Sequence, residues 1–407
     1  MRSAALAHVR VLDLSRVLAG PWATQALADL GAEVIKVERP GTGDETRGWG
    51  PPWLEPEAGE PRTAAYFAAA NRGKRSITID LSRPEGQAIV RRLAAWSDVV
   101  VENFKVGALA RYGLDHGALA RENPRLVTCS ISGFGQDGPY RDRPGYDFLL
   151  QAMGGLMSVT GAPDGVPGGG PTKVGVALTD VLTGMYAATA ILAALAHRDR
   201  TGEGQHVDLS LLDVQVAALA NQAQGYLVTG VPPARLGNAH PSIVPYQAFA
   251  TADGHLVLAV GNDAQFARFC AVAGRADLAQ DPRFATNAAR VTGRADLVRI
   301  LEPLLASRPT AAWVAALEAA DVPCGPINDL AQVFADPQVR HRGLRVEIPR
   351  PGGAAIPVVR SPMRLSATPV VPELPPPALG EHTREVLREV LGMSDEDVRA
   401  LRERGIV

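Results

Sequence analysis

The chain has 407 residues, of which 46% are hydrophobic and 21% are charged. At about 150 residues per domain, this length favours two or three domains, and the composition excludes a disordered or disulfide-stapled scaffold. The 41 basic and 43 acidic residues give a net charge of -2, so the chain has no overall basic field that would hold a nucleic acid or an anionic membrane. Any anionic ligand therefore needs a local site.

The cysteine pattern and the apolar stretches favour a cytoplasmic protein with no membrane partner. Cys129, Cys270 and Cys324 lie far apart, without the spacing of a metal site or a disulfide framework. Charged residues interrupt the N-terminal apolar run before a signal-peptide core can form. Residues 181–196 are too few to cross a bilayer, and residues 214–234 carry several polar side chains and two prolines.

Short β-branched runs alternate with helical patterns in the first part of the chain. Strand, helix and strand in repetition predict a parallel sheet with crossover helices, which is an α/β fold. The strands are expected at residues 9–14, 34–37, 77–79, 99–101 and 126–131, and the helices at residues 21–30 and 85–95.

The middle of the chain predicts two loops and two apolar helices. Residues 132–145 and 161–171 are rich in Gly and Pro, and long loops of this kind usually serve a site. A helix is expected from Asp180 to about residue 198, followed by a second helix over residues 211–227.

Beyond residue 232 the pattern becomes α+β. The Asp253-Gly254 turn between two apolar runs predicts a hairpin, and three helical segments follow it. The expected organisation is a large domain over residues 1–205, a linker helix over 206–232, a small α+β domain over 233–345, a linker over 346–378 and C-terminal helices over 379–407.

One glycine pattern resembles a dinucleotide-binding fingerprint. Gly133, Gly135 and Gly138 follow a predicted strand with the G-x-G-x-x-G spacing. The fingerprint needs a helix that begins at the glycines, and Pro139 and Pro144 interrupt any such helix. A plain loop is therefore favoured over the alternative function, a nicotinamide-dependent oxidoreductase.

Asp180 allows two interpretations, since it is the only acid in the first turn of an otherwise apolar helix. As an N-terminal cap it would stabilise the helix by about 1 kcal/mol, and on the residues alone this is the favoured interpretation. The alternative is an exposed, ionised carboxylate that acts as a nucleophile, with N–H donors nearby.

Basic residues gather near the ends of the early strands. The carboxyl ends of strands are where an open α/β sheet binds ligands, so this group is either a phosphate site or a solvated basic face. Its members are Lys36, Lys74 and Lys105, which are three of the four lysines, with Arg39, Arg72, Arg75 and Arg111.

Taken together, these residues resemble the class III CoA-transferases of the CaiB/BaiF type over nearly the whole chain. Within that family, residues 237–249 and 322–328 are most similar to the succinyl-CoA:glutarate CoA-transferases. The other matching motifs lie at residues 12–21, 31–40, 43–49, 74–77, 101–104, 144–147, 179–180 and 380–383.

For the fold, the resemblance implies a large Rossmann-like domain to which the C-terminal helices return, a smaller α+β domain and two linkers. It also implies a homodimer of two interlocked chains with the active site near their interface.

For the site, the resemblance makes Asp180 the acyl-accepting nucleophile and places Trp49 beside the acyl pocket. Leu18, Ala19, Tyr146 and Asp147 would line the path of the pantetheine arm. The nucleotide of CoA would contact Arg39, Ile79, Asp80, Leu81, Ser82, Asn103, Phe104, Lys105 and Arg111. Arg47 and Arg72 are candidates for holding the acceptor's distal carboxylate, because a guanidinium binds a carboxylate with two hydrogen bonds.

The implied activity moves CoA from an acyl-CoA, with succinyl-CoA expected, to a carboxylic acid such as glutarate. The route runs through an aspartyl mixed anhydride and an aspartyl-CoA thioester, with the CoA thioester as substrate, no tightly bound cofactor and no metal. An α-methylacyl-CoA racemase is the alternative within the family, but its histidine base would stand where this chain has Tyr146. Leu18 replaces the glutamine of the formyl-CoA enzymes, which argues against oxalate as the acceptor.

Overall fold

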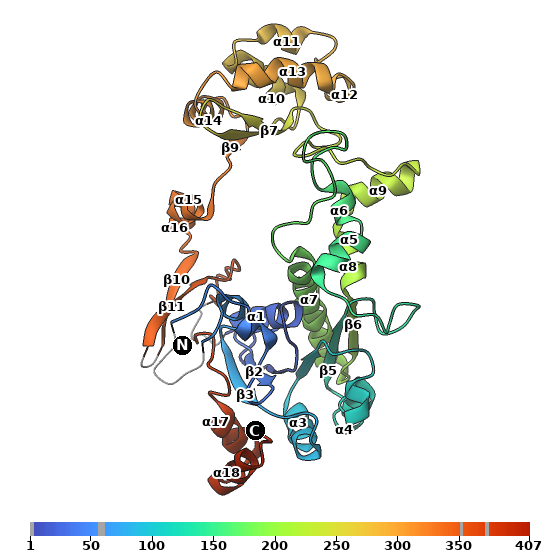
Figure 1. Cartoon of the computed structure of the whole chain (residues 1–407), viewed down its shortest axis with the longest axis vertical. Helices are drawn as coiled ribbons and strands as arrows, with labels where there is room; N and C mark the ends of the chain where they lie inside the picture. Colours follow the sequence, from blue (N-terminus) through green and yellow to red (C-terminus); the bar gives the residue numbers. More distant parts are fainter. Residues whose placement is uncertain (1–3, 56–61, 351–352, 371–373) are drawn as a thin grey trace. The chain divides into compact units, whose positions relative to one another are not determined.

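The computed structural model describes residues 4–55, 62–350, 353–370 and 374–407, so parts of the predicted linker 346–378 lie outside the described residues. The chain divides into two compact units (Figure 1). Unit 1 comprises Met1–Leu156, Val174–Ala223 and Gln338–Val407, and unit 2 comprises Met157–Lys173 and Gln224–Pro337.

Unit 1 is built on a six-stranded sheet in which all neighbouring strands are parallel, with the order β3-β2-β1-β4-β5-β6. The strands are β1 (Arg10–Asp13), β2 (Glu33–Glu38), β3 (Lys74–Thr78), β4 (Val99–Glu102), β5 (Val127–Ser132) and β6 (His206–Ser210). This confirms the predicted α/β class. The strand order reverses between β1 and β4, and in open α/β sheets ligands bind beyond the carboxyl ends of the strands at such a point.

Helices cover both faces of this sheet, which explains why its strands are nearly continuous apolar runs. Alternate residues of one strand enter different cores: Val99 and Val101 of β4 pack on one side and Val100 on the other. The helices of unit 1 include α1 (Ala19–Asp29), α2 (Ala65–Ala69), α3 (Pro84–Trp96), α4 (His116–Glu122), α5 (Asp147–Met153), α7 (Leu178–Thr201) and α8 (Leu211–Ala218).

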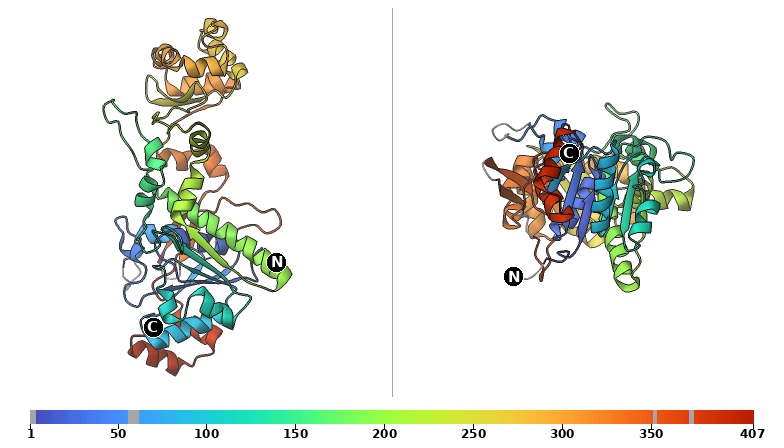
Figure 2. Two further views of the ribbon diagram at one scale, coloured as in Figure 1. Left: turned by 90° about the vertical axis from the view of Figure 1, so that its right-hand side faces the viewer. Right: turned by 90° about the horizontal axis from the view of Figure 1, so that it is seen from below.

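The C-terminal helices α17 (Thr383–Leu391) and α18 (Asp395–Glu403) lie beside α3 on one face of the sheet (Figure 2). Val386 and Val398 belong to the same core as Leu12 of β1. The opposite face is covered by α1 and α7, which have the most extensive contact between any two helices of the chain's described part. Unit 1 also contains the short 3-10 helices η1 (Glu45–Gly48) and η2 (Leu109–Tyr112) and the hairpin of β10 (Arg345–Arg350) with β11 (Gly353–Val359).

The linker helix predicted over residues 206–232 does not begin at residue 206, because the first five of these residues form a strand of the sheet. Residues 206–210 form β6, which pairs with β5 as the edge strand. The sequence pattern did not predict this strand, because it is short and carries polar side chains such as His206 and Asp208. The helix expected over 211–227 is two helices, α8 and α9 (Ala220–Thr229), and Ala220 has a positive φ of 45° at their junction.

Helix α7 has 24 residues, whereas the helical stretch expected over residues 181–196 was too short to cross a bilayer. By length and composition alone it could span a bilayer. Ala187, Ile191 and Leu195 of this helix are nevertheless buried in the core of unit 1, as in the central helix of a globular domain.

Unit 2 contains both helices and an antiparallel sheet, and its bounds differ from the small domain expected over residues 233–345. Its sheet has the order β7-β8-β9, with β7 (Tyr246–Ala250) and β8 (His255–Ala259) paired antiparallel across the predicted Asp253-Gly254 turn and β9 (Cys324–Pro326) beside β8. Trp313, Phe266 and Phe284 are fully buried in its core. Its helices are α10 (Asp263–Val272), α11 (Ala276–Gln280), α12 (Asn287–Thr292), α13 (Arg294–Leu305), α14 (Thr310–Ala319) and α15 (Leu330–Ala335); α6 (Leu156–Val159) and α16 (Pro337–His341) stand at the boundaries.

Candidate active site

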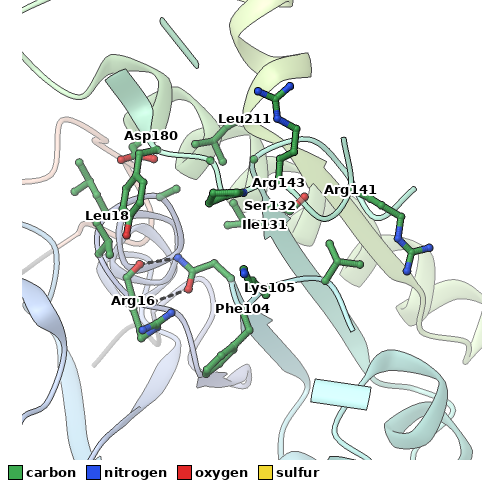
Figure 3. Close-up of a pocket in the computed structure, with 18 of the residues that line it drawn as sticks. Arg16, Leu18, Phe104, Lys105, Ile131, Ser132, Arg141, Arg143, Asp180 and Leu211 are labelled. Carbon is green, nitrogen blue, oxygen red and sulfur yellow. Dashed lines mark hydrogen bonds between the residues drawn. The ribbon is translucent and has the colours of Figure 1, made fainter. Parts of the chain in front are cut away.

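A cavity of about 400 Å³ lies in unit 1 at the point where the strand order reverses. Residues that follow β1, β4 and β5 line it, and Asp180 lies on one side of it with Arg141 on the opposite side (Figure 3). The lining comprises Arg16, Val17, Leu18, Ala19, Glu45, Asn103, Phe104, Lys105, Val106, Ile131, Ser132, Gly133, Arg141, Arg143, Pro144, Gly145, Tyr146, Asp180 and Leu211. The cavity is therefore in the place that the topology of the sheet favours for a ligand.

Asp180 is the third residue of α7, and only 9% of its surface is exposed. Its carboxylate makes no hydrogen bond or ion pair with any of the described residues. The cap of α7 is Asp147 instead, since its Oδ1 accepts from the backbone N–H of Thr179 at 2.8 Å and of Asp180 at 3.3 Å. The cap interpretation of Asp180 is thus wrong, and the carboxylate is left facing the cavity.

Burial raises the pKa of Asp180 to about 7, and the negative charge of Asp147 contributes in the same direction. Burial and the charges of Asp180 and Asp147 also raise the pKa of Tyr66, a residue of α2. The Tyr66 ring meets Trp49 edge-on, with their centroids 5.2 Å apart. Tyr66 is therefore close enough to the two acids to interact with their charges, whereas Trp49, expected beside the acyl pocket, contacts Tyr66 but does not line the cavity that contains Asp180.

Tyr66 was not among the site residues predicted from the sequence. The residue stands in an alanine-rich stretch with no motif around it, and only the fold brings it near Asp180.

A buried amide network holds the segment that leads into α7. Gln151 donates to Asp147 Oδ2 at 2.7 Å and accepts from the backbone N–H of Val174 at 2.9 Å. Thr179 donates its hydroxyl to Gln215 Oε1 at 2.6 Å. Gln151, Thr179 and Gln215 are all fully buried, so the first turn of α7 is fixed from α5 and from α8.

The turn between β1 and α1 forms another wall of the cavity and is strained. Val17 has a φ of 70°, which is rare for a β-branched residue. Asn103 holds the preceding residue through two hydrogen bonds with the backbone of Arg16, at 2.8 and 2.7 Å, and Asp44 accepts from Val17 N–H (Figure 3). The side chains of Arg16 and Glu45 form an ion pair at 2.6 Å. The expected pantetheine-path residues Leu18, Ala19 and Tyr146 all line the cavity, whereas Asp147 does not.

A second cavity of about 640 Å³ shares Arg16, Glu45 and Phe104 with the first. Its lining includes Arg39 and all four of the residues expected to contact the nucleotide after β3, namely Ile79, Asp80, Leu81 and Ser82. Arg39 is exposed, and its guanidinium makes no hydrogen bond or ion pair within the described part of the chain. The fold therefore brings a guanidinium without a carboxylate partner among the described residues to a cavity that adjoins the one containing Asp180.

Of the other residues expected near the nucleotide, Asn103, Phe104 and Lys105 line the first cavity, and Arg111 lines neither. Arg111 is an exposed residue in the last turn of η2.

Most of the predicted basic group is used inside the protein. Lys36 and Lys74 are fully buried, and their ammonium nitrogens lie 3.0 Å from Asp44 and from Asp13. Arg75 pairs with Glu33, Glu385 and Glu389. Only Lys105, Arg39 and Arg111 of this group have no carboxylate partner among the residues that the structure describes. Neither alternative, a phosphate site or a solvated basic face, therefore describes the group as a whole, because Lys36, Lys74, Arg72 and Arg75 pair with acids.

The two arginines considered for the acceptor are also engaged. Arg47 pairs with Glu38 at 2.7 Å, donates to the carbonyl oxygen of Pro377 and stacks on Phe67. Arg72 pairs with Asp29 at 2.5 Å. Both guanidinium groups are at least nine-tenths buried, and neither residue lines the cavity that contains Asp180.

The glycine fingerprint has the context of a loop. No helix starts at Gly138; the next one, α5, begins at Asp147. Gly133 and Gly145 instead close the base of the loop, where a Cβ on Gly133 would lie 2.7 Å from the Cα of Gly145. The glycines permit this close approach of two backbones, and the nicotinamide alternative loses its support.

The sequence of residues 6–383 matches the model of CoA-transferase family III. The chain belongs to this family. It is 54% identical over 394 residues to a succinate--glutarate CoA-transferase from Agrobacterium fabrum, covering 96% of both chains. It is 45% identical over 402 residues to a succinyl-CoA:glutarate CoA-transferase from Mus musculus, covering 99% of this chain and 90% of that protein.

Solved structures support the same assignment. A CaiB/BaiF family protein from Brucella suis superposes with a TM-score of 0.85 at 48% identity, covering 96% of this chain and all (100%) of that one. A hypothetical protein from Mycobacterium tuberculosis gives a TM-score of 0.82 at 35% identity, covering 94% and 99%. The family resemblance inferred from the motifs is confirmed, and the chain is a family III CoA-transferase.

Proposed function

We propose that this CoA-transferase moves CoA from succinyl-CoA to glutarate, with Asp180 as the covalent nucleophile. The names of its relatives support the two acids. The observation that carries the proposal is the Asp180 carboxylate, which is buried, unpaired among the described residues and part of a cavity that shares Arg16, Glu45 and Phe104 with the cavity containing Arg39.

Four exchanges at Asp180 account for the transfer. An Asp180 oxygen attacks the thioester carbonyl of succinyl-CoA, which releases the CoA thiolate and leaves an aspartyl succinyl anhydride. The thiolate attacks the aspartyl carbonyl, which gives aspartyl-CoA thioester and succinate. A glutarate carboxylate then attacks this thioester and releases the thiolate again, and the thiolate attacks the glutaryl carbonyl to give glutaryl-CoA and free Asp180. Covalent catalysis thus splits one exchange into easier steps.

The nucleophile must be ionised for the first step. Because the pKa of Asp180 is raised to about 7, the ionised fraction and the rate should both rise as the pH increases through that value. The cavity also has to exclude water, which would hydrolyse the anhydride.

The nucleotide end of CoA is proposed to lie in the groove with Arg39, whose guanidinium would meet a phosphate. The active form is proposed to be the interlocked homodimer and the location the cytoplasm, with no tightly bound cofactor. The high fraction of exposed apolar side chains on α5 and α9, such as Phe148 and Leu227, supports an assembly of chains.

A different arginine from those expected suits the acceptor's distal carboxylate. Arg143 lines the cavity with Asp180, stacks on the rings of Tyr140 and Phe134 at 4.5 and 5.5 Å, and has no carboxylate partner in the described ranges. Arg16 and Arg141, in contrast, already pair with acids. We therefore propose Arg143 for this role in place of Arg47 and Arg72.

The experiment that tests the proposed function measures CoA exchange by the purified enzyme. Succinyl-CoA is offered with glutarate, hydroxymethylglutarate, itaconate, malate, mesaconate or oxalate, and the new thioesters are resolved by mass. Glutaryl-CoA is expected as the main product. A parallel reaction with a chiral 2-methylacyl-CoA in D2O should leave the α-carbon unlabelled, because Tyr146 replaces the racemase histidine. Rapid α-deuteration without CoA exchange would establish the racemase alternative instead.

Replacing Arg143 by Leu should impair dicarboxylate acceptors more than monocarboxylate acceptors. A lost charge-assisted contact of this kind corresponds to about a tenfold to hundredfold loss in kcat/KM for glutarate. Butyrate is the matched acceptor, since it is glutarate with the distal carboxylate replaced by hydrogen, and its slow transfer should change little. A uniform loss for both acids would remove Arg143 from the acceptor site.

A further inference from the structure

Asp147 has all of its oxygen atoms bound by the protein near Asp180. Oδ1 accepts the two N–H groups at the start of α7, and Oδ2 accepts from Gln151 at 2.7 Å. Gln151 is fully buried, so its side chain holds the Asp147 carboxylate in one orientation. A carboxylate bound in this way is poorly placed to act as a base or to contact a CoA arm, and Asp147 is absent from the cavity lining.

The charge of Asp147 is not needed to cap α7. The amide oxygen of an asparagine could accept from the N–H groups of Thr179 and Asp180 equally well. Its NH2 group would face Gln151, which cannot turn to accept from it without losing the hydrogen bond that it accepts from Val174 N–H. What only an aspartate supplies here is a negative charge close to a second, buried carboxylate. Two neighbouring carboxylates normally disfavour each other's ionised forms.

We propose that Asp147 is a positioning residue for Asp180: it fixes the first turn of α7 through two backbone N–H groups and places a negative charge beside the nucleophile. The catalytic consequence rests on the proposed function. Acylation converts Asp180 into a neutral anhydride and moves its charge to the departing thiolate. The repulsion between the two carboxylates is relieved at that step. This relief lowers the free energy of the acylated enzyme relative to the resting enzyme and so favours acylation.

The other charged and titratable groups around Asp180 do not supply the same field. Tyr66 faces it from α2 and is neutral at physiological pH, since burial raises its pKa. Of the charged residues that line the cavity, Arg16 pairs with Glu45, and Arg141 pairs with Asp142. The cavity's remaining cations, Lys105 and Arg143, would lower the pKa of Asp180, whereas burial and the charge of Asp147 raise it.

The test is a direct titration of Asp180 by infrared spectroscopy on the full-length protein. The infrared spectrum of each protein is compared with that of the same protein carrying Asp180→Asn, and the difference isolates the protonated carboxyl band of Asp180. We compare the wild type with Asp147→Asn and with Asp147→Ser, a shorter neutral cap, so that a folding failure of one variant leaves the other. Glu203→Gln is the matched control, because it removes one exposed acid just beyond the opposite end of α7.

The midpoint should lie near pH 7 in the wild type and in Glu203→Gln. It should fall by about one pH unit or more in both Asp147 variants, since a like charge is removed from a poorly solvated pair. An unchanged midpoint in a folded Asp147 variant would overturn the proposal, and so would an equal shift in Glu203→Gln.

The kinetic profile then separates the two proposals. In an active enzyme, the acidic limb of the rate profile should move to lower pH in Asp147→Asn by the same amount, while the plateau falls because a less basic carboxylate is a weaker nucleophile. If the infrared midpoint shifts as expected but the wild type transfers no CoA between any pair of acids, the proposed function fails and the positioning role of Asp147 stands.

Discussion

Asp180→Asn should lose CoA transfer almost completely, with a fall in turnover of about 10³-fold or more. An amide cannot open the thioester or carry the acyl group, so every exchange that we assign to Asp180 is blocked. Binding of CoA should remain close to that of the wild type, because the nucleotide groove with Arg39 is lined by residues of other elements. Transfer is measured by mass-resolved thioester exchange, and CoA affinity by calorimetry.

The fold should survive this change. The Asp180 side chain makes no hydrogen bond within the described ranges, and Asp147 caps the helix through backbone groups that the substitution leaves in place. An unaltered thermal unfolding temperature is therefore the control. Turnover like that of the wild type in a folded Asp180→Asn protein would refute the covalent role and would return the residue to a structural one.

Local patterns were sufficient to predict the layers of the fold and the location of Asp180. The alternation of apolar strands and amphipathic helices predicted the parallel sheet, and an acid at the start of an apolar helix marked position 180. At the site, the cap of α7 was missed because contacts between distant residues leave no local trace. The hydrogen bond from Thr179 to Asp147 spans 32 positions, and the sequence could not show that the cap of α7 comes from another helix.

The basic residues among the early strands illustrate a different limit, because their prediction counted charges of one sign only. Lys36 lies inside β2 and Lys74 begins β3, so neither stands at the carboxyl end of its strand as expected. Their buried side chains meet Asp44 and Asp13. The acids Asp13 and Asp44 were equally visible in the sequence, and weighing them against the lysines would have predicted internal pairs. A patch of charge near strand ends is thus informative only after both signs have been counted.

Lys74→Met should cost about 3–5 kcal/mol of unfolding free energy, because it leaves the Asp13 carboxylate buried without its ammonium partner. Lys74 and Asp13 are both fully buried, and the Lys74 ammonium also donates to Asn71 and to the carbonyl oxygen of Pro21. Methionine is similar in length and makes none of these contacts. Denaturant unfolding measures the loss, and Lys105→Met is the matched control, since Lys105 is exposed and has no acid partner in the part of the chain that the structure describes.

The pH dependence of this loss identifies its cause. Burial alone would raise the pKa of Asp13, but Lys74, Lys36 and two hydroxyl donors outweigh it and lower the pKa from 3.8 to about 2. A depressed folded pKa stabilises the protein above the unfolded value, and this contribution disappears as the pH falls toward 2. In Lys74→Met the Asp13 carboxylate is expected to take up a proton more readily, so the difference in unfolding free energy from the wild type should narrow on acidification.

Adding Asp13→Asn to Lys74→Met should recover part of the stability, because it removes the buried charge that has lost its partner. If the single variant is as stable as Lys105→Met, or if its deficit is the same at every pH, the buried pair does not hold this end of the sheet together.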